Sequence, residues 1–136
     1  MKHDESKLMI AEFFNYLNNR EWEKLELLLA ENFEAILPQT RETIKGQKNY
    51  IEILKRFPET YKIEHLNLYL EHDRWDFTDT VISEVLIQAQ LPDGREIKCF
   101  VVSIFVIETE MIISATHYWG DSGPAPTWRK NLVETY

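Results

Sequence analysis

The sequence predicts an α+β domain in which three helices precede an antiparallel sheet. Apolar residues recur at helical spacing through the first part of the chain, and the period changes to two after Thr60. The apolar fraction of 44% and the charged fraction of 28% are those of ordinary globular proteins. A length of 136 residues suits a single domain, so residues 1–136 are expected to form one unit.

The N-terminal part carries the patterns of three helices and one short strand. The first helix is expected over residues 4–18 and a second, short helix over residues 22–31. A third helix lies between Gly46 and Pro58, because proline cannot continue a helix. A strand over residues 32–37 is predicted between the second and third helices.

The C-terminal part alternates apolar and polar residues and is rich in β-branched side chains. Both features are typical of antiparallel strands that bury one face. The predicted strands cover residues 63–71, 81–91, 96–107 and 112–119.

The dipeptide Asp93-Gly94 separates the two central strands and is a strong hairpin signal. If it forms a two-residue loop, Glu84 pairs with Ser103, and the register decides which side chains share a face. One face of the hairpin is then mixed in polarity and carries Glu84, Leu86, Gln88, Cys99, Val101 and Ser103.

The next hairpin is less constrained by its sequence. A three-residue loop at 108–110 would pair Val101 with His117, and would place His117 and Trp119 on the mixed face. A loop of two or four residues would reverse that assignment. The position of His117 therefore depends on the loop length.

The order of elements, with three sequence segments, resembles the nuclear-transport-factor-2-like superfamily and its SnoaL-like branch. The segments are NREWEKLELLLAENFEAILP, LPDGREIKCFVVSIFVIE, and ISATHYWGD with the tail PAPTWR. This resemblance implies a cone-shaped fold, with three N-terminal helices packed in a curved antiparallel sheet and a pocket between them. It also implies that His117 and Trp119 lie on the inner face, in agreement with the three-residue loop.

Ketosteroid isomerases of this superfamily use a Tyr on the first helix and two Asp residues, one before the strand-ending proline and one in the penultimate strand. Phe13, Leu37 and Ser103 stand at those places here. The general base and both oxyanion donors are missing, so ketosteroid isomerase activity is not expected. Tyr16, one helical turn from Phe13, is a partial replacement for the lost phenol.

The resemblance and the registers together predict a pocket that binds a small, mostly apolar ligand. Glu84 beside His117 would form an acid–imidazole pair, which suits isomerase, cyclase or hydrolase chemistry without a cofactor. Alternatively, the two side chains only satisfy each other, and the chain is a non-catalytic binding or adaptor module acting through its outer sheet face. The residues expected to contact the ligand are Tyr16, Leu37, Leu86, Gln88, Val101, Ser103 and Trp119.

The other face of the predicted hairpin is almost wholly apolar, and no predicted helix is left to cover it. The resemblance of the chain to the superfamily implies that two such faces pair across a two-fold axis, so a homodimer is expected. The residues expected on this face are Val85, Ile87, Phe100, Val102, Ile104 and Tyr118.

Composition excludes several other classes of protein. A net charge of −8 without a basic cluster argues against nucleic-acid binding, and no apolar stretch is long enough for a membrane span. A single cysteine, Cys99, permits no intrachain disulfide, and the absence of metal-binding spacings predicts no metal and no cofactor. The charged N-terminal segment shows no signal-peptide pattern, so a cytoplasmic location is expected.

Overall fold

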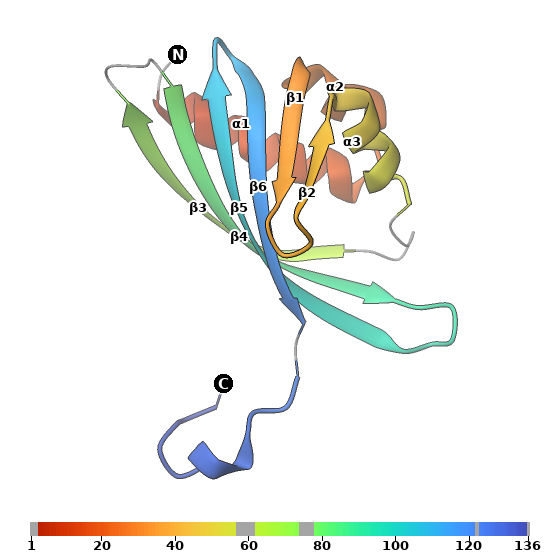
Figure 1. The fold of residues 1–136 in the computed structure, drawn as a ribbon, viewed down its shortest axis with the longest axis vertical. Coiled ribbons are helices and arrows are strands. Elements are labelled where there is room, and N and C mark those ends of the chain that lie inside the picture. Colours follow the sequence, from red (N-terminus) through yellow and green to blue (C-terminus); the bar gives the residue numbers. More distant parts are fainter. Residues whose placement is uncertain (1–2, 57–61, 74–77, 122, 136) are drawn as a thin grey trace.

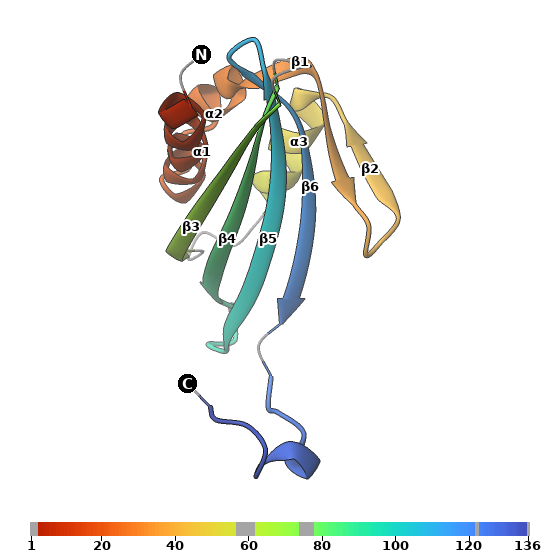
Figure 2. The ribbon, with the colours of Figure 1, turned by 90° about the vertical axis from the view of Figure 1, so that its left-hand side faces the viewer.

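The computed structural model describes residues 3–56, 62–73, 78–121 and 123–135. Three helices, α1 (His3–Asn18), α2 (Trp22–Leu28) and α3 (Gln47–Leu54), lie on one side of a curved sheet (Figure 1; Figure 2). This arrangement confirms the predicted fold class. Pro58, the predicted end of the third helix, is outside the described residues. No helix in the described ranges is long and apolar enough to cross a membrane.

The sheet has six strands in the order β2-β1-β6-β5-β4-β3, and its only parallel pair is β1 with β6 among the strands described. The β2 strand was not predicted, because four residues are too few to show a period. The second helix ends earlier than predicted, at Leu28, since Leu29 begins a strand and is fully buried. The strands are β1 (Leu29–Leu37), β2 (Glu42–Lys45), β3 (Lys62–Asp73), β4 (Thr78–Gln90), β5 (Glu96–Glu108) and β6 (Met111–Asp121).

An aromatic cluster joins α1 to the inner face of the sheet, which is the face that carries the helices. The ring centroid of Phe105 in β5 lies 5.1 Å from that of Phe13 and 5.9 Å from that of Phe14. Such edge-to-face contacts add to the free energy of burial. The Phe105 ring also contacts the imidazole of His117 in β6, with a centroid distance of 5.9 Å, so the core and the candidate site are continuous.

The predicted register of the β4–β5 hairpin is wrong by one residue. Leu91 N–H donates to Arg95 O, and Gly94 N–H donates to Leu91 O, which makes a three-residue loop. Pro92 suits the second position of a type I turn, and Gly94 is the left-handed residue that follows the turn, with φ of 89°.

This one-residue change reverses the faces of β4 relative to β5. Ser83, not Glu84, pairs with Ser103, and Val85 pairs with Val101. Val85 and Ile87, predicted on the outer face, therefore belong to the inner face. Phe100 and its neighbours at even positions of β5 keep their predicted place on the outer face, away from the helices.

The β5–β6 hairpin differs from the predicted loop but places its residues on the predicted faces. Its loop has two residues, Thr109 and Glu110, both with positive φ, at 51° and 62°. An irregularity then follows, because Ile107 pairs with Ile112 and Val106 pairs with Ser114. The extra residue cancels the reversal that a two-residue loop alone would cause. His117 and Trp119 consequently lie on the inner face.

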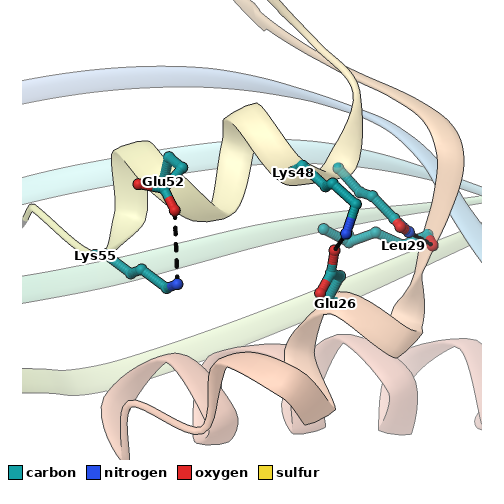
Figure 3. A network of polar contacts seen from close by, with 6 residues as sticks. Glu26, Leu29, Lys48, Glu52 and Lys55 are labelled. Atoms are coloured by element: carbon teal, nitrogen blue, oxygen red, sulfur yellow. Dashed lines mark hydrogen bonds and ion pairs between the residues drawn. The ribbon is translucent and has the colours of Figure 1, made fainter.

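Polar contacts hold the start of α3 against α2 and β1 (Figure 3). Lys48 Nζ lies 3.2 Å from Glu26 Oε1 of α2. Gln47 Nε2 donates to Leu29 O of β1 at 3.3 Å. Anchoring this end of the helix fixes the position of Tyr50, one turn further along.

Candidate functional site

A cavity of about 410 Å³ lies between the helices and the inner face of the sheet. This volume is within the range of small-molecule sites. Its wall is mainly aliphatic and aromatic. The lining residues are Phe13, Phe14, Leu17, Leu37, Thr40, Glu42, Ile44, Tyr50, Ile53, Val85, Ile87, Ala89, Ile97, Cys99, Val101, Ser103, His117 and Trp119.

The imidazole of His117 lies between two hydroxyl groups in this wall. Its Nε2 is 2.7 Å from Tyr50 Oη, and its Nδ1 is 2.6 Å from Ser103 Oγ. Tyr50 comes from α3, while Ser103 pairs directly with His117 across β5 and β6. Because Tyr50 and Ser103 are both buried, the two hydroxyls fix both ring nitrogens.

Burial lowers the pKa of His117 from 6.5 to about 4, since desolvation disfavours the imidazolium. The ring is therefore neutral at pH 7, with one nitrogen donating and the other accepting. Either Tyr50 donates to Nε2 and Nδ1–H donates to Ser103, or every bond in the chain runs the opposite way. The site can thus present a donor or an acceptor to a ligand without carrying charge.

Tyr50 is the site residue that sequence reasoning missed, since it was not among the predicted site residues. It lies on the buried side of α3 with Ile51 and Leu54. A buried tyrosine usually requires a hydrogen-bond partner for its hydroxyl, so its place in an apolar stripe was an available signal. The partner, His117, is 67 residues away in sequence, and no local pattern identifies it.

The structure brings five of the predicted site residues to the cavity. They come from β1, β5 and β6, and their contacts with a ligand remain predictions. These residues are Leu37, Val101, Ser103, His117 and Trp119.

The predicted Glu84–His117 pair is wrong, because Glu84 lies on the outer face. It pairs with Val102 across the hairpin and is exposed. Its Oε1 accepts a hydrogen bond of 2.8 Å from the Tyr69 hydroxyl, and this bond raises the pKa of Tyr69. The cause of the error is the one-residue register change at the β4–β5 turn.

Three other predicted ligand contacts lie away from the cavity. Leu86 and Gln88 share the outer face with Glu84, and Gln88 Nε2 donates to Glu96 Oε2 at 3.3 Å. Tyr16 packs against the core from α1, with Lys24 Nζ 5.9 Å from its ring centroid. None of these three is among the described residues that line the cavity.

Ionisable groups in the wall are few. Glu42 is the sole acid, and there is no Lys or Arg, among the described lining residues. Burial, with a smaller contribution from Asp121, raises the pKa of the Cys99 thiol, so this side chain is protonated at neutral pH. The described part of the chain holds no group of three or more His, Cys, Asp or Glu that could bind a metal ion.

Solved structures with the same architecture include a proposed ketosteroid isomerase from Kribbella flavida. It has a TM-score of 0.80 and 23% identity, over 98% of this chain and 91% of that chain. An NTF2-like protein of unknown function from Burkholderia xenovorans has a TM-score of 0.71 and 15% identity, with 98% of each chain covered. The epoxide hydrolase/cyclase-like enzyme SalBIII has a TM-score of 0.70 and 20% identity, over 88% of this chain and 95% of that chain.

These likenesses establish the fold of the chain. It is the nuclear-transport-factor-2-like (NTF2-like) fold, as the order of elements predicted. No protein-family model matches the sequence, and no curated protein matches it. Activity therefore has to be argued from the cavity itself.

Proposed function

We propose that the chain binds a small, uncharged, mostly apolar molecule in the cavity, with one oxygen-containing group held at His117. The observation that carries this proposal is the neutral His117 ring fixed between Tyr50 and Ser103 in an otherwise apolar wall. A small number of fixed polar groups in an otherwise apolar cavity is typical of sites that orient one functional group of a ligand.

The charge of the wall supports an uncharged ligand. A bound carboxylate or phosphate needs a cation or several donors, and the described lining residues include no Lys or Arg. The Glu42 carboxylate would also repel an anion. A ligand hydroxyl or carbonyl, in contrast, can join the hydrogen-bond chain whichever way that chain runs.

A second candidate is turnover of that ligand by acid/base chemistry of the isomerase or cyclase kind. The Tyr50–His117–Ser103 chain favours it, because reversal of the chain moves a proton between its two ends. The names of two proteins of the same fold, a proposed ketosteroid isomerase and an epoxide hydrolase/cyclase-like enzyme, point the same way. Loss of the predicted Glu84 partner weakens this candidate relative to simple binding.

Displacement of the uncharged dye Nile red tests the binding proposal. Three competitors of similar size differ only in polar group: naphthalene, 2-naphthol and 2-naphthoate. We expect 2-naphthol to displace the dye best and 2-naphthoate to displace it least. In Tyr50→Phe the advantage of 2-naphthol over naphthalene should shrink about threefold to tenfold, the value of one hydrogen bond.

Tyr69→Phe is the matched control, because its hydroxyl bonds to Glu84 on the other face of the sheet. It should leave all three affinities unchanged. Equal affinities for 2-naphthol and naphthalene in the wild-type protein would refute a polar anchor, and preference for 2-naphthoate would refute an uncharged ligand.

We also propose that two copies associate through the outer face of the sheet. Phe100 is 53% exposed and Tyr118 is 44% exposed on that face, with Val102 between them. We call these three residues the outer patch. Contiguous exposed apolar groups of this kind mark interaction surfaces. A monomer by light scattering at micromolar concentration would contradict the dimer, and a stable complex with another protein would favour an adaptor role instead.

A further inference from the structure

The segment after β6, residues 123–135, runs away from the body of the molecule beyond the end of that strand (Figure 1; Figure 2). We call it the C-terminal arm. All its residues except Arg129 are exposed. Two backbone hydrogen bonds shape it from within, Lys130 N–H to Thr127 O and Leu132 N–H to Arg129 O.

The arm carries large apolar side chains in water. Trp128 is 76% exposed and Leu132 is 79% exposed, and Val133 is also exposed. Burying a tryptophan and a leucine would remove several hundred Å² of apolar surface from water, and roughly 25 cal/mol is gained per Å². A segment with this composition is better suited to packing against a protein surface than to remaining in solvent.

We propose that the arm packs against the outer patch of a second copy of the chain, with Trp128 as its anchor. The patch offers three exposed apolar side chains, and the arm supplies apolar groups to cover them. This proposal extends the homodimer proposed above, because it makes the arm part of the interface.

Charge supports this pairing. Glu84 pairs with Val102 of the outer patch and is exposed beside it. Arg129 and Lys130 directly follow Trp128, so an arm that lays Trp128 beside Val102 brings two cations to Glu84, while Lys98 lies at the other end of the patch, beside Phe100. In a chain with a net charge of −8, such a basic pair offsets repulsion between two copies.

The direction in which the arm leaves β6 favours packing on the second copy over packing on the arm's own sheet. Tyr118 of the outer patch is only three residues before the end of β6 at Asp121. The arm leaves that end pointing away from the sheet, and although its last part bends back, it does not reach the sheet in either view (Figure 1; Figure 2). It would have to bend back much further to cover its own patch. Extended, residues 123–135 reach about 40 Å, enough to cross the sheet of a partner.

Sedimentation equilibrium of full-length variants tests the energetics. Trp128→Ser should raise the dissociation constant of the dimer about tenfold or more, as expected for an aromatic anchor. Leu132→Ser should also raise it. Leu27→Ser is the matched control, because Leu27 on α2 is 78% exposed, almost the same as Leu132, and is distant from the patch in sequence and on the opposite side of the sheet.

Disulfide trapping tests the geometry, in a Cys99→Ser background that contains no other cysteine. One tagged copy carries Asn131→Cys in the arm. A differently tagged copy carries Lys98→Cys, two residues before Phe100 and on the same, outer face of β5. Mild oxidation should link the two tags. Replacing Lys98→Cys by Leu27→Cys should abolish the link.

Three results would overturn the proposal. They are a wild-type monomer, a dimer whose strength is the same in Trp128→Ser, and a disulfide that forms only when both cysteines are in one copy. The second result would leave the outer-face dimer standing without the arm, and the third would return the arm to its own sheet. None of the three affects the ligand proposal, whose test is dye displacement.

Discussion

At the scale of single residues, a short polar row crosses an otherwise apolar inner face. Ser83 pairs with Ser103, and Ser103 pairs with His117. Tyr50 completes the row from α3 by its bond to His117. Polar groups at this depth cost free energy unless each is hydrogen-bonded, so packing alone does not account for the row.

The neutral state of His117 predicts a pH dependence of stability. Burial lowers the pKa of His117 to about 4, below its ordinary value of 6.5 in the unfolded chain. As the pH falls from 6.5 to 4, the unfolded chain binds a proton that the folded chain does not, so the free energy of unfolding decreases. The expected loss is about 3 kcal/mol over this window, with full stability above it.

Urea unfolding of the wild type and of His117→Gln at pH 7 and pH 4.5 measures this contribution. Carboxylates titrate in both proteins, so the difference between them isolates the imidazole. The wild type should lose about 2 kcal/mol more than the variant between the two pH values. Equal losses would mean that the folded protein accepts the proton readily.

Ser83 predicts a stabilising substitution. Its Oγ is buried and has no hydrogen-bond partner in the described structure. Ser83→Ala removes that unsatisfied group and should raise the free energy of unfolding by about 1 kcal/mol in urea denaturation. Ser103→Ala is the matched comparison, because it breaks the bond to His117 and should be destabilising. A loss of stability in Ser83→Ala would show that the hydroxyl has a partner.

At the scale of elements, two turns decide which side chains reach the cavity. The β4–β5 turn sets the faces of the central strands, and the β5–β6 turn with its extra residue sets the face of His117. A one-residue change at either turn moves a whole strand's side chains to the other face. The turn residues therefore control the site from a distance.

The backbone of the β5–β6 turn predicts a second stabilising change. Thr109 and Glu110 have φ of 51° and 62°, a conformation that side chains other than Asn and Gly adopt at a cost. Replacing the pair by Asn-Gly should raise the thermal midpoint, with a gain of about 1 kcal/mol. The same dipeptide placed at Glu108-Thr109 is a control that should not stabilise. A lower midpoint for the first variant would contradict a type I′ turn.

Sequence reasoning succeeded for elements with long runs of regular periodicity, and it failed where the residues of a turn decide the strand register. Strand alternation in β4 and β5 is clear, but the same alternation is compatible with either register. Pro92 favours a type I turn ahead of Gly94, and this outweighs the two-residue loop that Asp93-Gly94 suggests. The error moved Glu84 out of the site, while Ser103 and His117 stayed in it because their mutual register depends on another turn.

At the scale of the whole molecule, the sheet separates two surfaces of different character. The inner face and helices enclose the cavity, while the outer face carries Phe100 and Tyr118 exposed. The order of helices and strands, together with the three sequence segments that resemble the NTF2-like superfamily, was enough to predict this fold. The parallel β1–β6 pair was not predictable, because it joins strands from opposite ends of the chain and leaves no local signal.

This separation predicts that dimerisation and ligand binding can be uncoupled. Phe100→Glu puts a charge in the outer patch, where desolvation would oppose association, so the variant should be monomeric by light scattering. Phe100 is not among the described lining residues, and its neighbour Val101 faces the cavity from the other side of the strand. The dye affinity should therefore change by less than about twofold.

Val101→Glu is the reciprocal variant, because it places the same charge in the cavity wall. It should remain dimeric and lose dye binding, since an unpaired carboxylate in an apolar cavity opposes an apolar ligand. Circular dichroism establishes that both variants are folded. If Phe100→Glu lost dye binding together with dimerisation while still folded, the cavity would depend on contacts between two copies, and the separation of the two faces would not hold.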